Sequence, residues 1–152
     1  MTKRLHHGER PAEILLIDDN RGDALLAARA FHEAETDTRL TFAPTGEIAM
    51  AILQGELEYF GHRLPDLVLL DLSLPKMNGL EVLAAIKDRD RLKHIPVIVM
   101  SSSGDERNIL GSYRAQAAAY IPKPGDMAAY RQTIARIEQF FFLACRLPAV
   151  DS

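Results

Sequence analysis

The chain has 152 residues, of which 47% are hydrophobic and 26% are charged, and its formal net charge is -3. This length suits one domain with a proper core, and the lack of a basic excess argues against nucleic acid as a partner. A single cysteine, Cys145, cannot form an internal disulfide, and no apolar run approaches the ~20 residues of a membrane span. We expect a cytoplasmic domain over residues 13–144, with residues 1–12 as a flexible leader and residues 145–152 as a tail.

Strand-like and helix-like segments alternate along the first half of the chain. The apolar run 13–17 predicts a buried strand that ends in Asp18 and Asp19, and a helical pattern over 23–35 follows it. Asn20 or Asp23 could cap that helix. Residues 39–43 predict a second strand, and Thr45 is a candidate N-cap for a helix over 47–54.

The second half repeats this alternation after a polar connection over 55–65. Residues 66–70 predict a strand that ends in Asp71, and an amphipathic helix follows the loop around residues 75–79. Strands are predicted at 95–100, ending in Ser101, and at 117–121, just before Lys123. Helices are predicted at 105–114 and 126–144. Five strands that alternate with five helices predict an α/β fold with a doubly wound parallel sheet in the order 2-1-3-4-5.

The polar residues that follow the predicted strands are expected to share one pocket. Strand ends in an open parallel sheet lie at the same edge, and ligands bind there beside the switch point. The residues brought together in this way are Asp18, Asp19, Asp71, Ser101 and Lys123. Three neighbouring carboxylates repel by about 4 kcal/mol for each pair, so a lysine and a hard divalent cation such as Mg²⁺ are needed for balance. This set of groups suits phosphoryl transfer to an aspartate.

Five motifs in this order resemble a response-regulator receiver domain, over about residues 13–144. The motifs are Ile17-Asp18-Asp19-Asn20, Leu69-Leu70-Asp71-Leu72-Ser73-Leu74-Pro75, Asn78-Gly79-Leu80-Glu81, Val99-Met100-Ser101-Ser102 and Tyr120-Ile121-Pro122-Lys123-Pro124. The resemblance implies a two-component signalling switch that accepts a phosphoryl group from a histidine kinase on Asp71. It implies no enzymatic activity beyond the protein's own phosphorylation and dephosphorylation.

The resemblance also assigns roles within the site. It implies that Asp19, Asp71 and the backbone carbonyl of Ser73 bind Mg²⁺, while Asp18 acts mainly through water. Ser101 and Lys123 would contact the phosphoryl oxygens.

Two further features of the family concern the segment around the fifth strand. Tyr120 would be the switch aromatic that turns inward when Ser101 moves to the phosphate. The peptide between Lys123 and Pro124 would be cis, as suits a tight turn.

Three local features narrow the resemblance to one subfamily. They are the run Asp19-Asn20-Arg21-Gly22-Asp23, the polar connection over 55–65 and the aromatic run Phe140-Phe141-Phe142. Together they resemble single-domain regulators paired with bacterial phytochrome histidine kinases. The sequence departs from that pattern at Asp18, where Glu is frequent, and at Arg21, where Pro is common. Consecutive helical residues are ~100° apart, so the three phenylalanines cannot all face one core. We expect them to contribute to a symmetric homodimer.

Other interpretations remain open at this point. Asp71 alone would be an ordinary loop acid, and Tyr120 could be a core residue. An aspartyl phosphohydrolase needs a second acid two residues after the nucleophile, where this chain has Ser73. A flavin-binding module needs a Ser-, Thr- or Gly-rich turn in place of Asp18 and Asp19. A scaffold receiver that is not phosphorylated and a phosphorelay intermediate for another sensor kinase are further alternatives.

Overall fold

The structure is a computed structural model of the whole chain, and it describes residue 3 and residues 10–59, 61–102 and 104–148. Most of the predicted leader and the last four residues of the predicted tail lie outside these ranges. None of the helices in the described ranges combines the length and apolar character required to cross a membrane.

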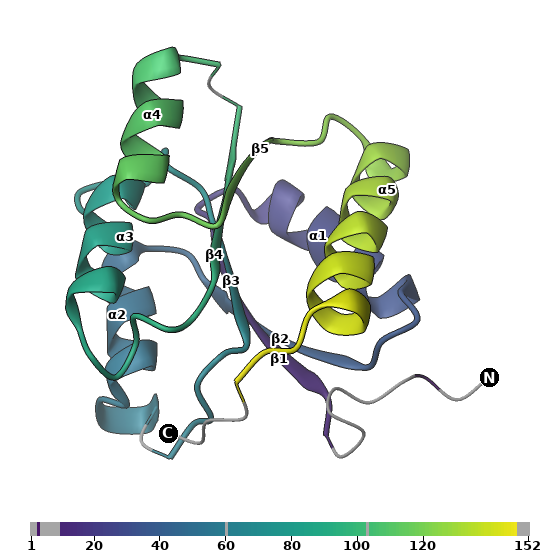
Figure 1. Cartoon of the computed structure of the whole chain (residues 1–152), viewed down its shortest axis with the longest axis horizontal. Coiled ribbons are helices and arrows are strands. Elements are labelled where there is room, and N and C mark those ends of the chain that lie inside the picture. The colour runs from purple at the N-terminus through teal and green to yellow at the C-terminus, as the bar shows by residue number, and fades with distance from the viewer. Residues whose placement is uncertain (1–2, 4–9, 60, 103, 149–152) are drawn as a thin grey trace.

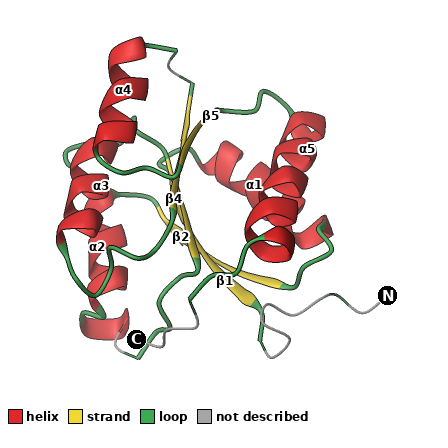
Figure 2. Cartoon of the chain, viewed as in Figure 1, coloured by secondary structure: helices red, strands yellow, loops and turns green. Residues whose placement is uncertain are grey.

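Five parallel strands form one sheet in the order β2-β1-β3-β4-β5, which confirms the predicted α/β fold (Figures 1 and 2). The strands are β1 (Ala12–Ile17), β2 (Thr38–Ala43), β3 (Leu67–Leu70), β4 (Val97–Ser101) and β5 (Ala119–Pro122). The helices are α1 (Arg21–Glu33), α2 (Gly46–Gln54), α3 (Gly79–Asp88), α4 (Glu106–Arg114) and α5 (Met127–Ile137), with a 3-10 turn at Leu57–Tyr59 and a π-helix at Glu138–Ala144.

Helices cover both faces of the sheet, and each face has its own core. Figure 1 shows α2, α3 and α4 on one side and α1 and α5 on the other. The first core contains Val82, Leu83 and Ile86 of α3, packed against strand residues such as Val68. The second contains Phe31 of α1 and the α5 residues Tyr130 and Ile134. Because both faces are covered, β1, β3 and β4 are buried along their whole length, as their unbroken apolar runs predict.

Each α-helix begins at a polar side chain that accepts a backbone N–H of its first turn. Asn20 caps α1 by accepting the N–H of Asp23 at 3.0 Å, and Thr45 caps α2 through Ile48 at 3.1 Å. Asn78, Asp105 and Asp126 do the same for α3, α4 and α5. These caps satisfy N–H groups that a helix leaves unpaired at its start. The caps therefore fix the starting point of each helix, at the edge of the sheet where the predicted site lies.

Gly79, the first residue of α3, lies directly against the end of β3. A Cβ atom at this position would come within 2.5 Å of the Leu72 Cα and 2.6 Å of the Asp71 carbonyl oxygen. Real Cβ atoms essentially never approach backbone this closely, so only glycine fits here without a shift. The start of α3 is thereby pressed against the segment that carries Asp71.

The last helix is not the single α-helix over 126–144 that the sequence predicts. It is α-helical to Ile137 and then widens into the π-helix, where the N–H of Cys145 donates to the Phe140 carbonyl at 2.7 Å. Glu138, at the junction, is only 5% exposed, and its carboxylate accepts the backbone N–H of Thr36. At this junction the acid points inward to the α1–β2 connection, and Phe141 and Phe142 pack against the second core.

Candidate functional site

The predicted site residues converge at one edge of the sheet, because backbone hydrogen bonds align the strand ends. The Asp71 N–H donates to the Ile17 carbonyl at 2.9 Å, which places Asp71 beside Asp18. The Lys123 N–H donates to the Ser101 carbonyl, also at 2.9 Å. Asp18, Asp71 and Ser101 are 4%, 6% and 1% exposed. The convergence predicted from the fold is therefore present.

Asp18, Asp19 and Asp71 form a carboxylate cluster that can hold a cation. One ligand oxygen from each lies within 4.8 Å of the others. Asp18 and Asp71 are buried, whereas Asp19 is exposed, so the cluster opens toward solvent on one side. Hard carboxylate oxygens in this number suit Mg²⁺ and similar divalent cations, which usually keep several waters as well. The donor set therefore fits the metal that the sequence predicts.

Lys123 occupies the centre of the same pocket, and its side chain is 11% exposed. Its Nζ atom lies 2.9 Å from Asp18 Oδ2, 3.1 Å from Asp71 Oδ2 and 2.8 Å from Asp23 Oδ2. One ammonium thus contacts three carboxylates from three segments of the chain. We call Asp18, Asp19, Asp71 and Lys123 the acidic pocket.

Burial and charge oppose each other in the protonation of this pocket. Burial raises the pKa of Asp18, and the Asn20 backbone N–H and the Lys123 ammonium counteract it in part. Burial by itself would lower the pKa of Lys123, but hydrogen bonds to Asp23 and Asp18 and the nearby negative charge raise it overall. Lys123 therefore stays charged at neutral pH and balances part of the negative charge.

Backbone N–H groups hold two of the carboxylates in place. Asp18 Oδ1 accepts the Asn20 N–H at 2.9 Å, and Asp71 Oδ1 accepts the Ser73 N–H at 3.1 Å. Each of these aspartates therefore points one oxygen at a backbone donor and the other at Lys123. The Ser73 backbone lies against Asp71, which is the position required if its carbonyl is to bind the predicted cation.

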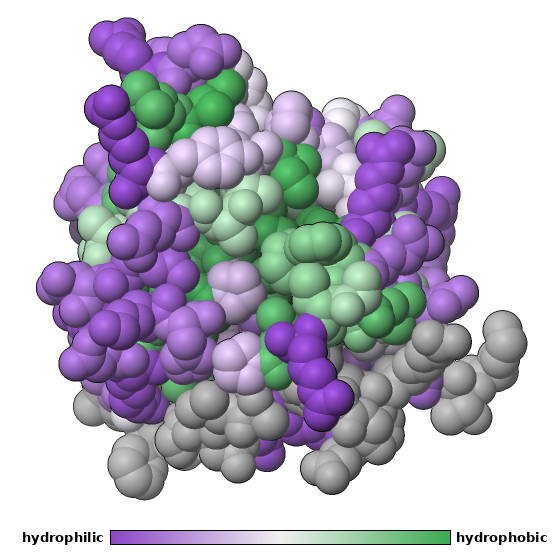
Figure 3. All heavy atoms as spheres, viewed as in Figure 1, coloured by the Kyte–Doolittle hydropathy of each residue, from purple (hydrophilic) through white to green (hydrophobic). Residues whose placement is uncertain are grey.

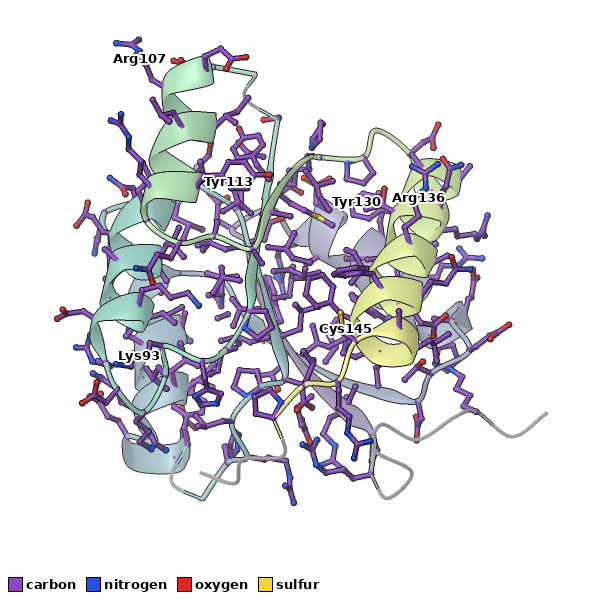
Figure 4. The ribbon with its side chains drawn as sticks, in the orientation of Figure 1. Lys93, Arg107, Tyr113, Tyr130, Arg136 and Cys145 are labelled. Atoms are coloured by element: carbon purple, nitrogen blue, oxygen red, sulfur yellow. The ribbon has the colours of Figure 1, made fainter. Side chains whose placement is uncertain are left out.

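Tyr120 lies on β5, half-buried against the first core. Its backbone N–H donates to the hydroxyl of Tyr113 at 3.1 Å, and Tyr113 extends from α4 toward β5 (Figure 4). A cavity of about 340 Å³ lies between these elements, and its lining includes Ser101, Tyr113, Tyr120 and Lys123. Tyr120 thus borders an open space that reaches the end of β4.

The peptide between Lys123 and Pro124 is trans, so the predicted cis bond is wrong. The chain changes direction at Gly125 and Asp126, where it bends into α5. The turn is made by these residues, and the Lys123–Pro124 bond keeps the trans form that X–Pro peptides prefer by about 0.5–1 kcal/mol.

Asp23 is the site residue that the sequence did not identify as such. The sequence offers it as a candidate helix cap, but Asn20 takes that role and the Asp23 carboxylate points to Lys123 instead. The sequence does contain a signal for this role. Only three residues separate the end of β1 from the start of α1, so the first-turn side chains of α1 lie close to that strand end. An acid there lies near any cation at the edge of the sheet.

The three consecutive phenylalanines are divided between the core and the surface. Phe141 and Phe142 pack against the second core, whereas Phe140 is 57% exposed and Leu143 39% exposed. Phe140 contacts the Phe141 ring edge to face, with centroids 5.0 Å apart. The expected division is present, and an apolar surface remains at the end of the chain's last helix.

The chain is similar to known proteins in both sequence and structure. The chain is 37% identical to the response regulator Rcp1 of Synechocystis sp. over 139 residues, which cover 91% of this chain and 95% of Rcp1. Its structure resembles the phosphorylated cyanobacterial phytochrome response regulator RcpA, with a TM-score of 0.87 and 38% identity over 91% of this chain and 99% of RcpA. The Mn²⁺-bound form of Rcp1 gives a TM-score of 0.85 and 37% identity over 91% of this chain and all of that one. Residues 14–135 match the response regulator receiver domain, and the chain belongs to this family of signalling switches.

Proposed function

We propose that Asp71 is the phosphoacceptor of this response regulator. The observation that carries the proposal is the contact of one lysine ammonium with Asp71 inside a carboxylate cluster that fits a divalent cation. Asp71 is buried, yet it lies beside the one cluster carboxylate, Asp19, that is exposed, so a donor can approach from that side. The protein would act as a phosphoacceptor switch whose chemistry is limited to its own phosphorylation and dephosphorylation.

The reaction follows from the positions of the side chains. An oxygen of Asp71 attacks the phosphorus of a phosphohistidine, the P–N bond breaks, and the histidine nitrogen leaves with the bonding electron pair. Lys123, already at 3.1 Å, can donate to a phosphoryl oxygen, and the Ser101 hydroxyl can donate to another. A Mg²⁺ ion held by Asp18, Asp19, Asp71 and the Ser73 carbonyl would neutralise the charge that develops on the phosphoryl group.

The substitution Asp71→Asn tests the phosphoacceptor. We expect it to abolish labelling by a small phosphodonor such as acetyl phosphate, because an amide is not a competent nucleophile, and to leave the circular dichroism spectrum unchanged. Asp88→Asn, at an exposed position on α3, is the matched control and should label like the unmodified protein. Equal labelling of Asp71→Asn and the control would refute the assignment. Replacing Asp19 with alanine should weaken Mg²⁺ binding, and equal affinity would count against the metal site.

Signal output is proposed to pass through Ser101 and Tyr120. Ser101 ends β4, and the cavity of about 340 Å³ beside it is bordered by Tyr120. Movement of Ser101 toward a phosphoryl group would let the Tyr120 ring turn into this space and change the surface formed by α4, β5 and α5. Nuclear magnetic resonance of the Tyr120 ring with and without a phosphate mimic tests this. Unchanged ring signals in a protein that binds the mimic would refute it.

The upstream partner is proposed to be a bacterial phytochrome histidine kinase in the cytoplasm. The support is the resemblance to RcpA, a phytochrome response regulator, over almost the full length of both chains. Phosphotransfer from a phytochrome kinase should be faster than from an unrelated histidine kinase of equal autophosphorylation. Equal rates from both kinases would remove the support for a light-sensing pathway and favour a general phosphorelay role.

We also propose a symmetric homodimer through the end of the last helix. The exposed ring of Phe140 adjoins a mostly apolar cavity of about 280 Å³ whose lining includes Ala119, Ile121 and Phe141. Figure 3 shows apolar surface in the middle of this face of the molecule. Light scattering should report a dimer that Phe140→Asp converts to monomer, whereas Leu25→Asp, at an exposed leucine on α1, should not. A monomeric unmodified protein would refute the dimer.

A further inference from the structure

Among the contacts of Lys123, the shortest is to a residue that belongs neither to the carboxylate cluster nor to the proposed phosphoacceptor. Asp23 Oδ2 lies 2.8 Å from Lys123 Nζ, compared with 2.9 Å for Asp18 and 3.1 Å for Asp71. An ammonium has three N–H donors and no acceptor. The three carboxylates therefore match its three donors.

The three contacts differ in how phosphorylation would change them. Asp71 loses its negative charge when its oxygen is bonded to phosphorus, and the phosphoryl oxygens then attract the ammonium. Asp18 belongs to the cluster that fits a cation, so its charge is shared once the cation is present. The Asp23 carboxylate lies on the first turn of α1, outside this cluster. Of the three contacts with Lys123, only the one made by Asp23 is left unchanged by phosphorylation and by cation binding.

The backbone holds Asp23 firmly in its position. Its N–H donates to the capping side chain of Asn20 at 3.0 Å, so the residue is fixed at the start of α1. The carboxylate itself does not take part in this cap, and it is 25% exposed while the lysine side chain is 11% exposed. Removing the carboxylate therefore leaves the helix cap intact and changes mainly the surroundings of Lys123.

We propose that Asp23 is a positioning residue, which holds the Lys123 ammonium from the α1 side so that it is already in place for the phosphoryl group. This inference rests on the proposed role of Asp71. A lysine side chain has about 2 kcal/mol of rotamer entropy, and a donor that is ordered before the reaction does not need to be ordered during it. Asp23 supplies this order without binding the phosphoryl group or the cation.

The substitution Asp23→Ala tests the inference at two levels. In metal-free, unphosphorylated protein, the ¹H–¹⁵N signal of the Lys123 ammonium should be visible in the unmodified chain and should broaden in the variant, because an unheld ammonium exchanges protons with water faster. With Mg²⁺ and acetyl phosphate, the rate of phosphorylation should fall about fivefold, which corresponds to about 1 kcal/mol in the barrier. Asp23→Asn, which keeps an acceptor oxygen, should recover part of the rate and serves if the alanine variant does not fold.

Two controls separate positioning from other effects. Glu47 is an exposed first-turn acid of α2, and Glu47→Ala should leave both the ammonium signal and the rate unchanged. In a Lys123→Ala background, adding Asp23→Ala should have no further effect on the rate, because Asp23 acts through the lysine.

An unchanged ammonium signal, an unchanged or higher rate in Asp23→Ala, or an equal loss of rate in the Lys123→Ala background would each overturn the inference. These results differ from failure of the proposed function, in which the unmodified protein would not be labelled on Asp71 at all. The ammonium signal is measured without phosphorylation, so it tests the contact in either case.

Discussion

Replacing Asp71 with asparagine removes one charge from the acidic pocket with almost no change of shape. In the resting protein this charge is opposed by Asp18 and Asp19, whose ligand oxygens lie within 4.8 Å, and favoured by Lys123 at 3.1 Å. At an effective dielectric constant near 20, a carboxylate pair at that separation repels by about 3.5 kcal/mol, and the ammonium contact attracts by about 5 kcal/mol. The two repulsions exceed the single attraction. Asp71→Asn should therefore stabilise the metal-free protein, by about 1–2 kcal/mol.

Urea unfolding in the presence of a chelator measures this gain, and the same titration with excess Mg²⁺ supplies the decisive comparison. A cation that binds the folded protein stabilises it, and the unmodified chain offers one more carboxylate ligand than the variant. The advantage of Asp71→Asn should therefore shrink or reverse when Mg²⁺ is added. The surface control Asp88→Asn should stay within about 0.5 kcal/mol of the unmodified chain in both conditions.

The reasoning fails if Asp71→Asn is less stable than the unmodified chain in chelator. It also fails if the gain is the same with and without Mg²⁺, because the stabilisation would then not come from carboxylate repulsion. High salt should reduce the gain only slightly, since Asp18 and Asp71 are buried and poorly screened.

Two other properties can be checked by unfolding experiments. Gly79→Ala should lower the free energy of unfolding by about 2–3 kcal/mol, because its Cβ would come within 2.5 Å of backbone, whereas Gly125→Ala meets nothing within 4 Å and should be nearly neutral; equal stability of the two variants would contradict the packing argument. Burial, together with the charge of Asp23, raises the pKa of Tyr130 to about 12, whereas an unfolded tyrosine ionises near 10. The contribution of this group to stability is complete below pH ~10 and is lost as the pH rises toward 12, by about 2–3 kcal/mol. Tyr130→Phe should lack this alkaline loss, and parallel pH profiles of the two proteins would show that the hydroxyl is not shielded.

The sheet and most of the acidic pocket could be predicted because the relevant signals are local. Three apolar runs are buried on both faces and end abruptly in Asp18, Asp71 and Ser101, so the parallel sheet alone brings those residues together. The predicted strand boundaries agree with the structure to within about two residues, which is the usual uncertainty where strands end. Lys123 could be included because it follows the fifth strand in the same way.

Features that depend on side-chain direction or on distant packing were not predictable in this way. The inward position of Glu138, where the π-helix begins, depends on a contact with the backbone of Thr36, 102 residues away in the sequence. The contact between Asp23 and Lys123 likewise depends on the rotation of α1 about its axis, which the Asn20 cap sets.

The outer edge of β5 has a consequence for how partners can bind. The pairing of Tyr120 with Val99 and of Pro122 with Ser101 points the backbone nitrogens of Tyr120 and Pro122 away from β4. Proline has no N–H to offer, and the N–H of Tyr120 donates to the Tyr113 hydroxyl. Exposed strand edges commonly recruit a further strand through outward N–H donors and carbonyl acceptors, and here neither outward nitrogen is available as a donor.

A strand that approaches this side of the protein therefore finds no backbone N–H donor at Tyr120 or Pro122 and would lose half of the usual ladder. A kinase or a second copy would have to recognise the surface of α4, β5 and α5 by shape and chemistry. Such recognition depends on the orientation of individual side chains, and Tyr113 and Tyr120 are among them. Binding through such side chains is sensitive to small rearrangements near Ser101. Binding through an added strand would be almost insensitive to those rearrangements.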